Sequence, residues 1–500
     1  MKLRESLKEI KKIKNLSGFY DWLFNSSAYL GTTEFILTNS FLRRRLFSLL
    51  IRYLRRVILS NKRFPAQVQE DKFYMGKALI GVLEKALEKS QKHPEFRKRL
   101  LRSVMPKVIK VAKETPKKRE IFRKKYHFAP PGFLTISPGK FCNLKCRGCY
   151  ANSTSAAKEK LDWDTVDRII TEKTKTWGSW FTVISGGEPF LWESQGKTLI
   201  DLARKHQNNI FLVYTNGTLI DKKMAQELAK VANITPAISV EGFAKETDER
   251  RGKGVHKKIL QAFKNLNEVG VPFGISMTAT RENADLITSE ELIKYYWNKG
   301  ASYAWIFQLM PIGRASMDLM VTPEQRLRMF RRTMRLIRKG YFIADFWNCG
   351  SISNGCFAAG RPGGGYLYIE WSGNVTPCVF VPYAVANINE IYKKGGSLNE
   401  ALASPFFKRI RKWQRDYALD KKCQEMGNWI LPCPIRDHYQ DMHKFLKKYS
   451  PKPIDEMASS ALKDKKYKEK LIDYDKKLEK IFDPIWEKEY TKSCEEKNKF

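Results

Sequence analysis

Three cysteines, Cys142, Cys146 and Cys149, stand in a C-x3-C-x2-C spacing on the short segment from Phe141 to Tyr150. Thiolates spaced in this way can bind three irons of a [4Fe-4S] cluster, which leaves the fourth iron open to a small molecule. A structural zinc site is the alternative, but such sites usually have two separated ligand pairs, and no matching pair lies nearby. A disulfide would leave one of the three thiols unpaired. The spacing therefore favours an iron–sulfur cluster.

A second motif, Ser185-Gly186-Gly187-Glu188-Pro189, follows an apolar run at residues 180–184. With the cysteine loop, it resembles the radical S-adenosylmethionine (radical SAM) superfamily. The resemblance implies that the open iron chelates the amino and carboxylate groups of SAM, and that Gly186, Gly187 and Glu188 hold its amino group. The family usually has an aromatic residue just before the third cysteine, whereas this chain has Gly148 there and Tyr150 after the cysteine.

Strand-like and helix-like segments alternate after Pro130-Pro131-Gly132. This alternation predicts a parallel sheet with right-handed crossovers. The predicted strands are Phe133 to Ser137, Trp180 to Ser185, Ile210 to Thr215, Thr235 to Val240, Phe273 to Thr278 and Tyr303 to Met310. Six such units resemble the partial (β/α)6 barrel of the radical SAM family, an α/β fold. By analogy with complete barrels, we expect the active residues at the carboxyl ends of the strands.

Polar groups follow several of these strands, and the family resemblance suggests roles for them. Asn216 follows the third strand, where its side chain could meet a ribose. Ser239 and Glu241 end the fourth strand, and Arg251 follows in a loop; related enzymes hold the SAM carboxylate with a serine and an arginine from this region. Leu309 ends the sixth strand, near where family members seat adenine.

Five further cysteines lie within residues 346–440, around a glycine-rich segment from Gly360 to Gly365. This region resembles the auxiliary-cluster extensions of radical SAM enzymes, the SPASM and twitch types. A full SPASM set has seven cysteines, and its C-x2-C-x5-C core is missing here, so the resemblance implies one auxiliary [4Fe-4S] cluster. The expected ligands are Cys349, Cys356, Cys378 and Cys433. Cys423 is the alternative to Cys433 or a free thiol, and Cys494 has no assigned role.

These patterns divide the chain into four regions. Residues 1–129 form a helical basic domain, 130–345 the radical SAM partial barrel, 346–440 an auxiliary iron–sulfur domain, and 441–500 a lysine-rich helical tail with a solvated charged face.

The net charge of +38, from 91 basic and 53 acidic residues, indicates an anionic partner. A lysine-rich surface of a heat-adapted protein is the alternative. The clustered cysteines suggest a reducing cytoplasm, and no apolar run is long enough for a membrane-spanning helix. The pattern of residues 41–63 predicts a helix whose apolar positions, which include Leu49 and Val57, form a stripe along one face. Its arginines, such as Arg43, lie mostly off that stripe.

The segment 18–37, upstream of this helix, is rich in aromatic residues. A basic amphipathic helix beside it could lie in a membrane interface, which would make the protein a peripheral membrane protein. The alternative is a helix that packs on the barrel with solvated arginines.

The family resemblance leaves the substrate open. The favoured hypothesis is carbon–carbon bond formation between hydrocarbon chains of membrane lipids, similar to archaeal-type lipid cross-linking synthases, with a low-potential donor such as ferredoxin or flavodoxin. A peptide-modifying maturase is an alternative, although residues 1–128 show no strand pattern for a winged-helix-like leader-binding domain. A nucleic-acid-modifying enzyme is a third, but the chain has no recognisable RNA-binding motif, so no specific nucleic acid is expected.

Overall fold

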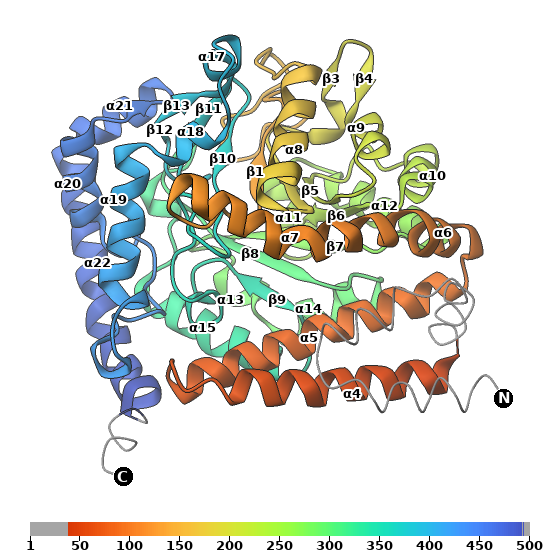
Figure 1. The fold of residues 1–500 in the computed structure, drawn as a ribbon, viewed down its shortest axis with the longest axis horizontal. Helices are drawn as coiled ribbons and strands as arrows, with labels where there is room; N and C mark the ends of the chain where they lie inside the picture. The colour runs from red at the N-terminus through yellow and green to blue at the C-terminus, as the bar shows by residue number, and fades with distance from the viewer. Residues whose placement is uncertain (1–38, 493, 495–500) are drawn as a thin grey trace.

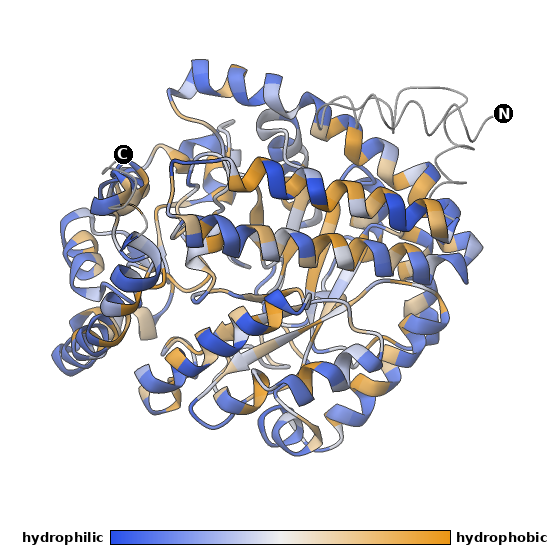
Figure 2. Cartoon of the chain, turned by 90° about the horizontal axis from the view of Figure 1, so that it is seen from below, coloured by the Kyte–Doolittle hydropathy of each residue, from blue (hydrophilic) through white to orange (hydrophobic). Residues whose placement is uncertain are grey.

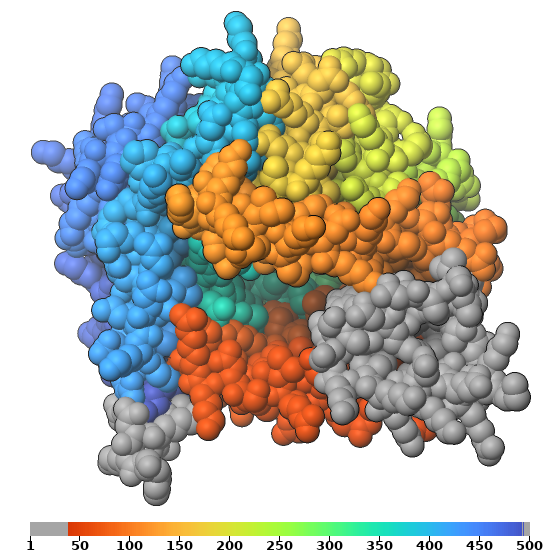
Figure 3. All heavy atoms as spheres, viewed as in Figure 1, coloured from red at the N-terminus to blue at the C-terminus, as the bar shows by residue number. Residues whose placement is uncertain are grey.

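The computed structural model describes residues 39–492 and residue 494 (Figure 1). From residue 39 to 126 the chain is helical, which confirms that part of the predicted helical region; the segment 18–37 lies outside the described residues. The helices are α4 (Ser40–Leu59), α5 (Ala66–Gln91), α6 (Pro94–Arg99), the π-helix η1 (Leu100–Val104) and α7 (Met105–Tyr126). Figure 3 shows the surface hollowed between α5 and α7.

The six predicted strands are all present and pair in parallel in chain order, which confirms the partial barrel. They are β1 (Leu134–Ile136), β2 (Phe181–Ile184), β5 (Ile210–Thr215), β6 (Ile234–Ser239), β7 (Gly274–Ala279) and β8 (Ala304–Gln308). Figure 2 shows apolar strands between helices whose outer faces are hydrophilic.

The elements between the strands follow the predicted alternation. The α-helices are α8 (Trp163–Trp177), α9 (Leu199–Lys205), α10 (Lys222–Val231), α11 (Ala244–Arg251), α12 (Val255–Glu268), α13 (Ala284–Ile287), α14 (Glu290–Asn298) and α15 (Pro323–Arg338). Shorter pieces are the 3-10 helices η2 (Pro189–Leu191) and η3 (Met317–Leu319) and the hairpin of β3 (Glu193–Ser194) and β4 (Lys197–Thr198).

The sheet extends beyond the six predicted strands at both edges. At one edge β9 (Ile343–Asp345), which the sequence reading missed, pairs parallel to β8. At the other edge β10 (Tyr368–Ile369) pairs parallel to β1, and β11 (Asn374–Thr376) and β13 (Ala386–Asn387) follow antiparallel. The cysteine-rich region therefore continues the barrel sheet, and the backbone N–H of Gly132 donates to Gly365 at 2.8 Å.

The C-terminal third surrounds this edge with short elements and helices. They are α16 (Gly350–Ser353), β12 (Tyr383–Ala384), α17 (Ile388–Lys393), α18 (Asn399–Leu402), α19 (Pro405–Gln414), η4 (Arg415–Leu419), η5 (Cys423–Glu425), α20 (Tyr439–Tyr449), β14 (Lys452–Pro453), α21 (Glu456–Lys463), α22 (Lys465–Trp486) and η6 (Glu487–Thr491). The face of α22 toward α15 and α20 buries Leu471, Leu478 and Phe482, so the predicted lysine-rich tail is solvated on one side only.

Helix α4 differs from the expected pattern in its register. Arg43, placed off the apolar stripe, is 2% exposed, whereas Leu49 and Val57, placed on it, are 36% and 47% exposed. The reason is that α4 packs along α5, where the side chain of Leu54 lies against Gly76, and this contact selects the buried face. Among the described helices, none is long and apolar enough to cross a membrane.

Two cysteines of the C-terminal region are joined to each other. Cys423, expected to be a free thiol or a cluster ligand, forms a disulfide with Cys494, which had no assigned role. Their separation of 71 positions in the sequence explains why local spacing did not predict the pair. The disulfide leaves Cys433 as the remaining choice for the fourth expected auxiliary ligand.

Candidate active site

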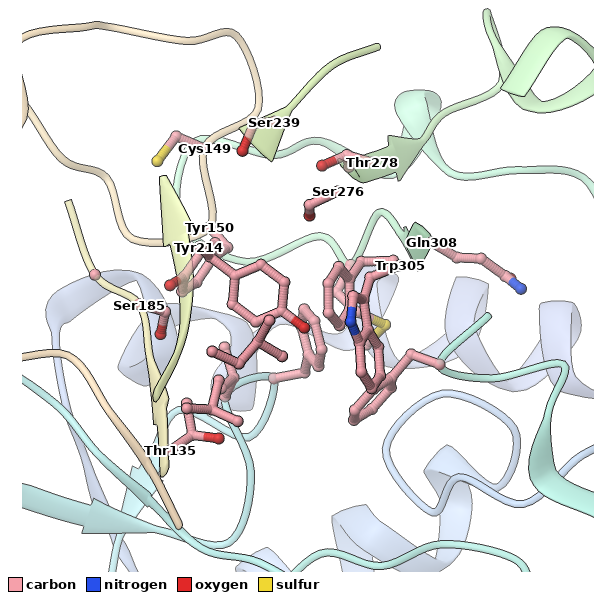
Figure 4. A pocket seen from close by; sticks show the side chains of 18 of the residues that line it. Thr135, Cys149, Tyr150, Ser185, Tyr214, Ser239, Ser276, Thr278, Trp305 and Gln308 are labelled. Atoms are coloured by element: carbon pink, nitrogen blue, oxygen red, sulfur yellow. The ribbon is translucent and has the colours of Figure 1, made fainter. Parts of the chain in front are cut away.

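A cavity of about 610 Å³ lies inside the partial barrel. Its lining includes the three cysteines of the loop and residues from the carboxyl ends of strands β5 to β8. In Figure 4, Cys149 and Ser239 stand at one end of the cavity and Thr135 at the other, and the rings of Tyr214 and Trp305 pack edge to face between them. The expectation that candidate residues gather at the strand ends is met by this arrangement.

The glycine motif lies directly against the cysteine loop. A Cβ atom on Gly187 would stand 2.0 Å from the carbonyl oxygen of Phe141, and one on Gly186 would stand 2.6 Å from that of Gly139. Both glycines line the cavity, and the N–H of Gly187 donates to Gly139 at 3.0 Å. Only residues without a side chain allow the two loops to approach so closely.

Glu188 is buried and ties this motif to the end of β5. Its carboxylate accepts hydrogen bonds from the hydroxyl of Thr215 and the backbone N–H of Asn216, both at 2.8 Å. Burial raises its pKa to about 6. The carboxylate lies outside the set of residues that line the cavity, so in this conformation it positions Gly187 and Asn216, which do line it.

Two side chains aim N–H groups at the sulfurs of the loop. The amide of Asn216 lies 3.9 Å from Sγ of Cys142, and a guanidinium nitrogen of Arg251 lies 4.0 Å from Sγ of Cys146. Donors of this kind stabilise the negative charge of thiolates. The structure therefore places Asn216 and Arg251 beside the cysteine loop, and their expected contacts with SAM stay a prediction.

Glu241 is buried behind the arginines and does not line the cavity. It accepts from Nε of Arg251 at 2.9 Å, also bonds Arg250, and accepts from the backbone N–H of Thr278 at 3.1 Å. Burial lowers the pKa of Arg251, but Glu241 and Cys146 outweigh it, and the net pKa is raised. Glu241 thus orients the two arginines, which do line the cavity.

Two further expected residues, Ser239 and Leu309, line the cavity. Ser239 is the last residue of β6, and Figure 4 shows its hydroxyl beside Cys149. Leu309 follows β8, and its backbone N–H donates to Ala279 at 2.8 Å. Its side chain lies against Gly148, where an added Cβ would stand 3.2 Å away. Gly148 has a φ of +67°, which explains a glycine at the position where the family usually has an aromatic residue.

Sequence reasoning missed several residues of the site. Arg314 clamps the cysteine loop by donating to Asn152 Oδ1, the carbonyl of Ser153 and the carbonyl of Cys146 at 2.8 to 3.2 Å. Its position directly after a barrel strand was the signal that could have found it. The aromatic wall was also missed, because its rings come from segments far apart in the sequence: Phe133, Tyr150, Phe181, Tyr214, Trp305, Phe307, Phe346, Phe357, Tyr366 and Phe380.

A second group of cysteines lies beyond this wall. Cys356, Cys378 and Cys433 line one small cavity, with Tyr366 Oη 2.8 Å from Sγ of Cys378. Burial raises the pKa of Cys378 to about 12. Cys349 does not line that cavity; its thiol faces the carbonyl of Ile343 at 3.9 Å. Three of the four expected auxiliary ligands are therefore together and the fourth is turned away.

Each cysteine group could supply three thiolates to an iron–sulfur cluster. Among the described residues, no three His, Cys, Asp or Glu side chains converge on one metal position. A [4Fe-4S] cluster does not require such convergence, because each thiolate binds a different iron. In the barrel, Cys142, Cys146 and Cys149 all line the cavity wall, and the N–H of Leu144 lies 3.4 Å from Sγ of Cys142. This donor set fits a cluster with one iron open toward the cavity.

Comparisons with known proteins agree with this geometry. Residues 136–289 match the family described as the radical SAM superfamily, and residues 356–425 match SPASM, an iron–sulfur cluster-binding domain. The chain is 28% identical over 245 residues to Fe-coproporphyrin III synthase of Methanosarcina barkeri, covering 46% of this chain and 56% of the relative. It is 26% identical over 265 residues to the sporulation killing factor maturation protein SkfB of Bacillus subtilis, covering 52% and 63%.

Two further matches extend the comparison. AdoMet-dependent heme synthase of Methanosarcina barkeri is 26% identical over 280 residues, covering 50% of this chain and 77% of the relative. The crystal structure of Streptococcus suis SuiB bound to the precursor peptide SuiA superposes with a TM-score of 0.52 and 19% identity, covering 68% of this chain and 79% of that chain. The chain spans less than two thirds of the first two curated relatives.

The two matched domains account for the cofactors. They imply a [4Fe-4S] cluster that binds SAM, SAM itself, and auxiliary iron–sulfur. The cysteine loop lies at the start of the first match, and Cys356 and Cys378 lie in the second. The chain thus contains a region that matches the radical SAM superfamily, followed by a region that matches the SPASM iron–sulfur cluster-binding domain.

Proposed function

We propose that this enzyme removes a hydrogen atom from an apolar part of a substrate that lies within the aromatic section of the barrel cavity. The observation that carries the proposal is the position of that section, between the cysteine loop and the auxiliary cysteines. Phe380 lines the main cavity and stands 4.8 Å, between ring centroids, from Trp347, which lines the auxiliary one. A substrate in this section would lie between both redox centres.

When bound, the reduced cluster and SAM would supply the radical chemistry that takes hydrogen from unactivated carbon. The residues of this chain orient SAM and exclude water. Gly187 and Asn216 would face its amino and ribose groups, and Arg251, fixed by Glu241, its carboxylate. Tyr214 and Trp305 close the space beside the reacting carbon with apolar surface.

The lining of the aromatic section favours an apolar group of the substrate over a polar peptide backbone. Buried polar groups without a partner cost free energy, and the aromatic section offers few hydrogen-bonding side chains. Gln308, one of those few, already donates to the buried Asp345 at 3.1 Å. We therefore infer that an apolar side chain, ring or hydrocarbon chain enters this section.

A peptide is our first candidate for the rest of the substrate. Its support is the similarity to SkfB, a maturation protein, and the fold shared with SuiB, whose structure contains a precursor peptide. Heme-type substrates are the second candidate, because two other relatives are named for Fe-coproporphyrin III and heme synthesis, and a flat ring suits aromatic walls.

Lipid cross-linking, the hypothesis favoured from the sequence, is less well supported. None of the relatives named above is described as a lipid enzyme. Helix α4 also supports this hypothesis less than expected, because its Arg43 is buried against α5, with its guanidinium 3.9 Å from the carboxylate of Glu88. The exposed Arg52, Arg55 and Arg56 still allow contact with an anionic surface, and vesicle binding would test it.

Deuterium transfer tests the proposal and separates the candidates. Reconstituted enzyme, SAM and a chemical reductant are incubated without oxygen with the peptide, porphyrin, lipid or nucleic-acid fraction of a deuterated cell extract. We expect deuterium in 5′-deoxyadenosine from one apolar fraction, and its loss when Trp305→Ala disrupts the wall. Transfer from a nucleic-acid fraction alone, or transfer unaffected by Trp305→Ala, would contradict the proposal.

A further inference from the structure

The cavity has a basic end opposite the cysteine loop. There its lining is formed by Ser353, Asn354, Arg361, Gly363 and Gly364. An added Cβ on Gly132, just before β1 begins, would stand 3.2 Å from Cα of Gly364. This end therefore lies at the amino end of β1, whereas the cysteine loop follows the carboxyl end of the same strand. Five extended residues separate the two, which is roughly 16 Å at 3.3 Å per residue.

Arg361 is a buried cation without an acidic partner. The residue is 8% exposed, and no described carboxylate lies within ion-pair distance of it, although the nearby thiol of Cys356 favours its charged form. Its two Nη atoms donate to the carbonyls of Ser353, Asn354 and Cys356 at 2.6 to 3.0 Å. A guanidinium has five N–H donors, so Nε and one Nη2 hydrogen have no acceptor among the described residues. Guanidinium N–H groups of this kind bind carboxylates and phosphates strongly.

A second cation, Lys72 of α5, adds to the same positive region. It has no ion-pair partner among the described side chains and lies over the rings of Phe64 and Trp429, at 4.4 and 5.8 Å from the centroids. Burial, and then the charge of Arg361, lower the pKa of Lys72 to about 8, and the nearby Asp71 only partly compensates. Asp71 itself is bonded to Ser351 and Tyr490 and lies 3.5 Å from Arg338.

We infer that Arg361, with Lys72 behind it, binds an anionic group of the substrate, a carboxylate or a phosphate, at the end of the cavity opposite SAM. An anion there would accept from the unused guanidinium donors and offset the repulsion between the buried Arg361 and the half-buried Lys72. The backbone of Gly363 and Gly364 leaves room beside it, because neither residue has a side chain. This inference rests on the proposed function and adds to it: the substrate is an amphiphile whose acidic group stands roughly 16 Å from the SAM end.

Binding of simple amphiphiles to the reconstituted holoenzyme tests the inference. The probes are dodecanoate, dodecyl phosphate and the neutral dodecanol, each kept below its micelle concentration, with affinity followed by calorimetry. We expect both anions to bind at least tenfold more tightly than dodecanol, since charge-assisted pairs are the strong ones. A preference for dodecanoate would indicate a carboxylate substrate, and a preference for dodecyl phosphate a phosphate head group.

The variants separate the anion site from general effects. Arg361→Lys keeps the charge but not the two-donor edge, and Lys72→Gln removes a cation that holds no backbone group. Both should reduce the preference for anions toward unity and leave dodecanol binding unchanged. Lys77→Gln, an exposed lysine on the same helix, is the matched control and should retain the preference. If Arg361→Lys changes only the electron paramagnetic resonance signal of the auxiliary cluster, with anion binding intact, the inference is wrong.

SAM cleavage by the same preparations keeps the two proposals apart. Cleavage without substrate requires the cysteine loop and the SAM contacts, so it is measured on the unsubstituted enzyme and on the control Lys77→Gln, where it should be equal. If the unsubstituted enzyme does not cleave SAM, that result would count against the proposed function alone. Normal cleavage with equal affinity for dodecanoate and dodecanol would overturn the anion site and leave the proposed function standing.

Discussion

Replacing Gly187 by alanine should disable the SAM-binding cluster while the rest of the molecule stays folded. The new Cβ would stand 2.0 Å from the carbonyl oxygen of Phe141 and 2.4 Å from that of Lys140, where ordinary contacts begin at 3.4 Å. The cysteine loop would have to move by more than 1 Å, because both atoms belong to its backbone. Gly187 itself is not among the glycines with positive φ, so the effect is steric and not conformational.

A displacement of this size is large for a reacting site, where about 1 Å can cost a factor of about 100 in rate. We therefore expect SAM cleavage to fall by about that factor or more. The assay is 5′-deoxyadenosine formation by anaerobically reconstituted enzyme, together with iron content and thermal unfolding. The overall fold should be less affected, since overpacking one loop contact costs about 1 to 3 kcal/mol.

Gly81→Ala is the matched control for this experiment. Gly81 lies inside α5 with no atom within 4 Å of an added Cβ, so alanine there should stabilise the helix by about 0.5 to 1 kcal/mol. Its SAM cleavage should equal that of the unsubstituted enzyme. Full cleavage by Gly187→Ala would refute the argument that the two loops must touch for the site to form.

Three further changes have expected outcomes. Glu241→Gln removes the charge that fixes two buried arginines, so it should weaken SAM binding about tenfold with iron content unchanged; equal affinity in equilibrium dialysis would contradict this. Asp437→Asn breaks the fully buried ion pair with Arg326 and should lower the free energy of unfolding in denaturant by about 3 to 5 kcal/mol. Asp285→Asn breaks the exposed ion pair with Arg328 and should lower it by about 1 kcal/mol or less. Equal losses would contradict the burial argument. Burial raises the pKa of Asp475 from 3.8 to about 8, so between these pH values the folded state keeps a proton that the unfolded state loses. The free energy of unfolding should therefore fall as pH rises from 4 to 8, by up to about 1.4 kcal/mol per pH unit. Thermal unfolding of Asp475→Asn should lack this dependence on pH.

The sequence predicted what depends on local spacing and strand alternation. The cysteine loop and the Gly-Gly-Glu-Pro motif are each continuous, and the structure places both at the cavity. The six strands were found within a few residues because apolar runs and helical periods alternate regularly. Strand β9, only three residues long, was missed because so short a run carries no periodicity.

The remainder depends on tertiary contacts. The buried face of α4 was misassigned at Arg43 because α5, not the helix itself, decides which side is covered. Cys423 and Cys494 meet only through packing of the C-terminal elements. Arg361 had no sequence signal for its free donors, since its surroundings come from α5, the loop after α16 and the glycine-rich segment.

Iron content and SAM cleavage in the cysteine-loop variant test the central claim most directly. The unsubstituted chain, prepared without oxygen, should hold about eight irons, four for each cysteine group. With Cys142, Cys146 and Cys149 all replaced by alanine, we expect about half of that iron to remain and no 5′-deoxyadenosine to form. SAM cleavage by this variant would contradict the assignment of the loop as the site of the radical chemistry.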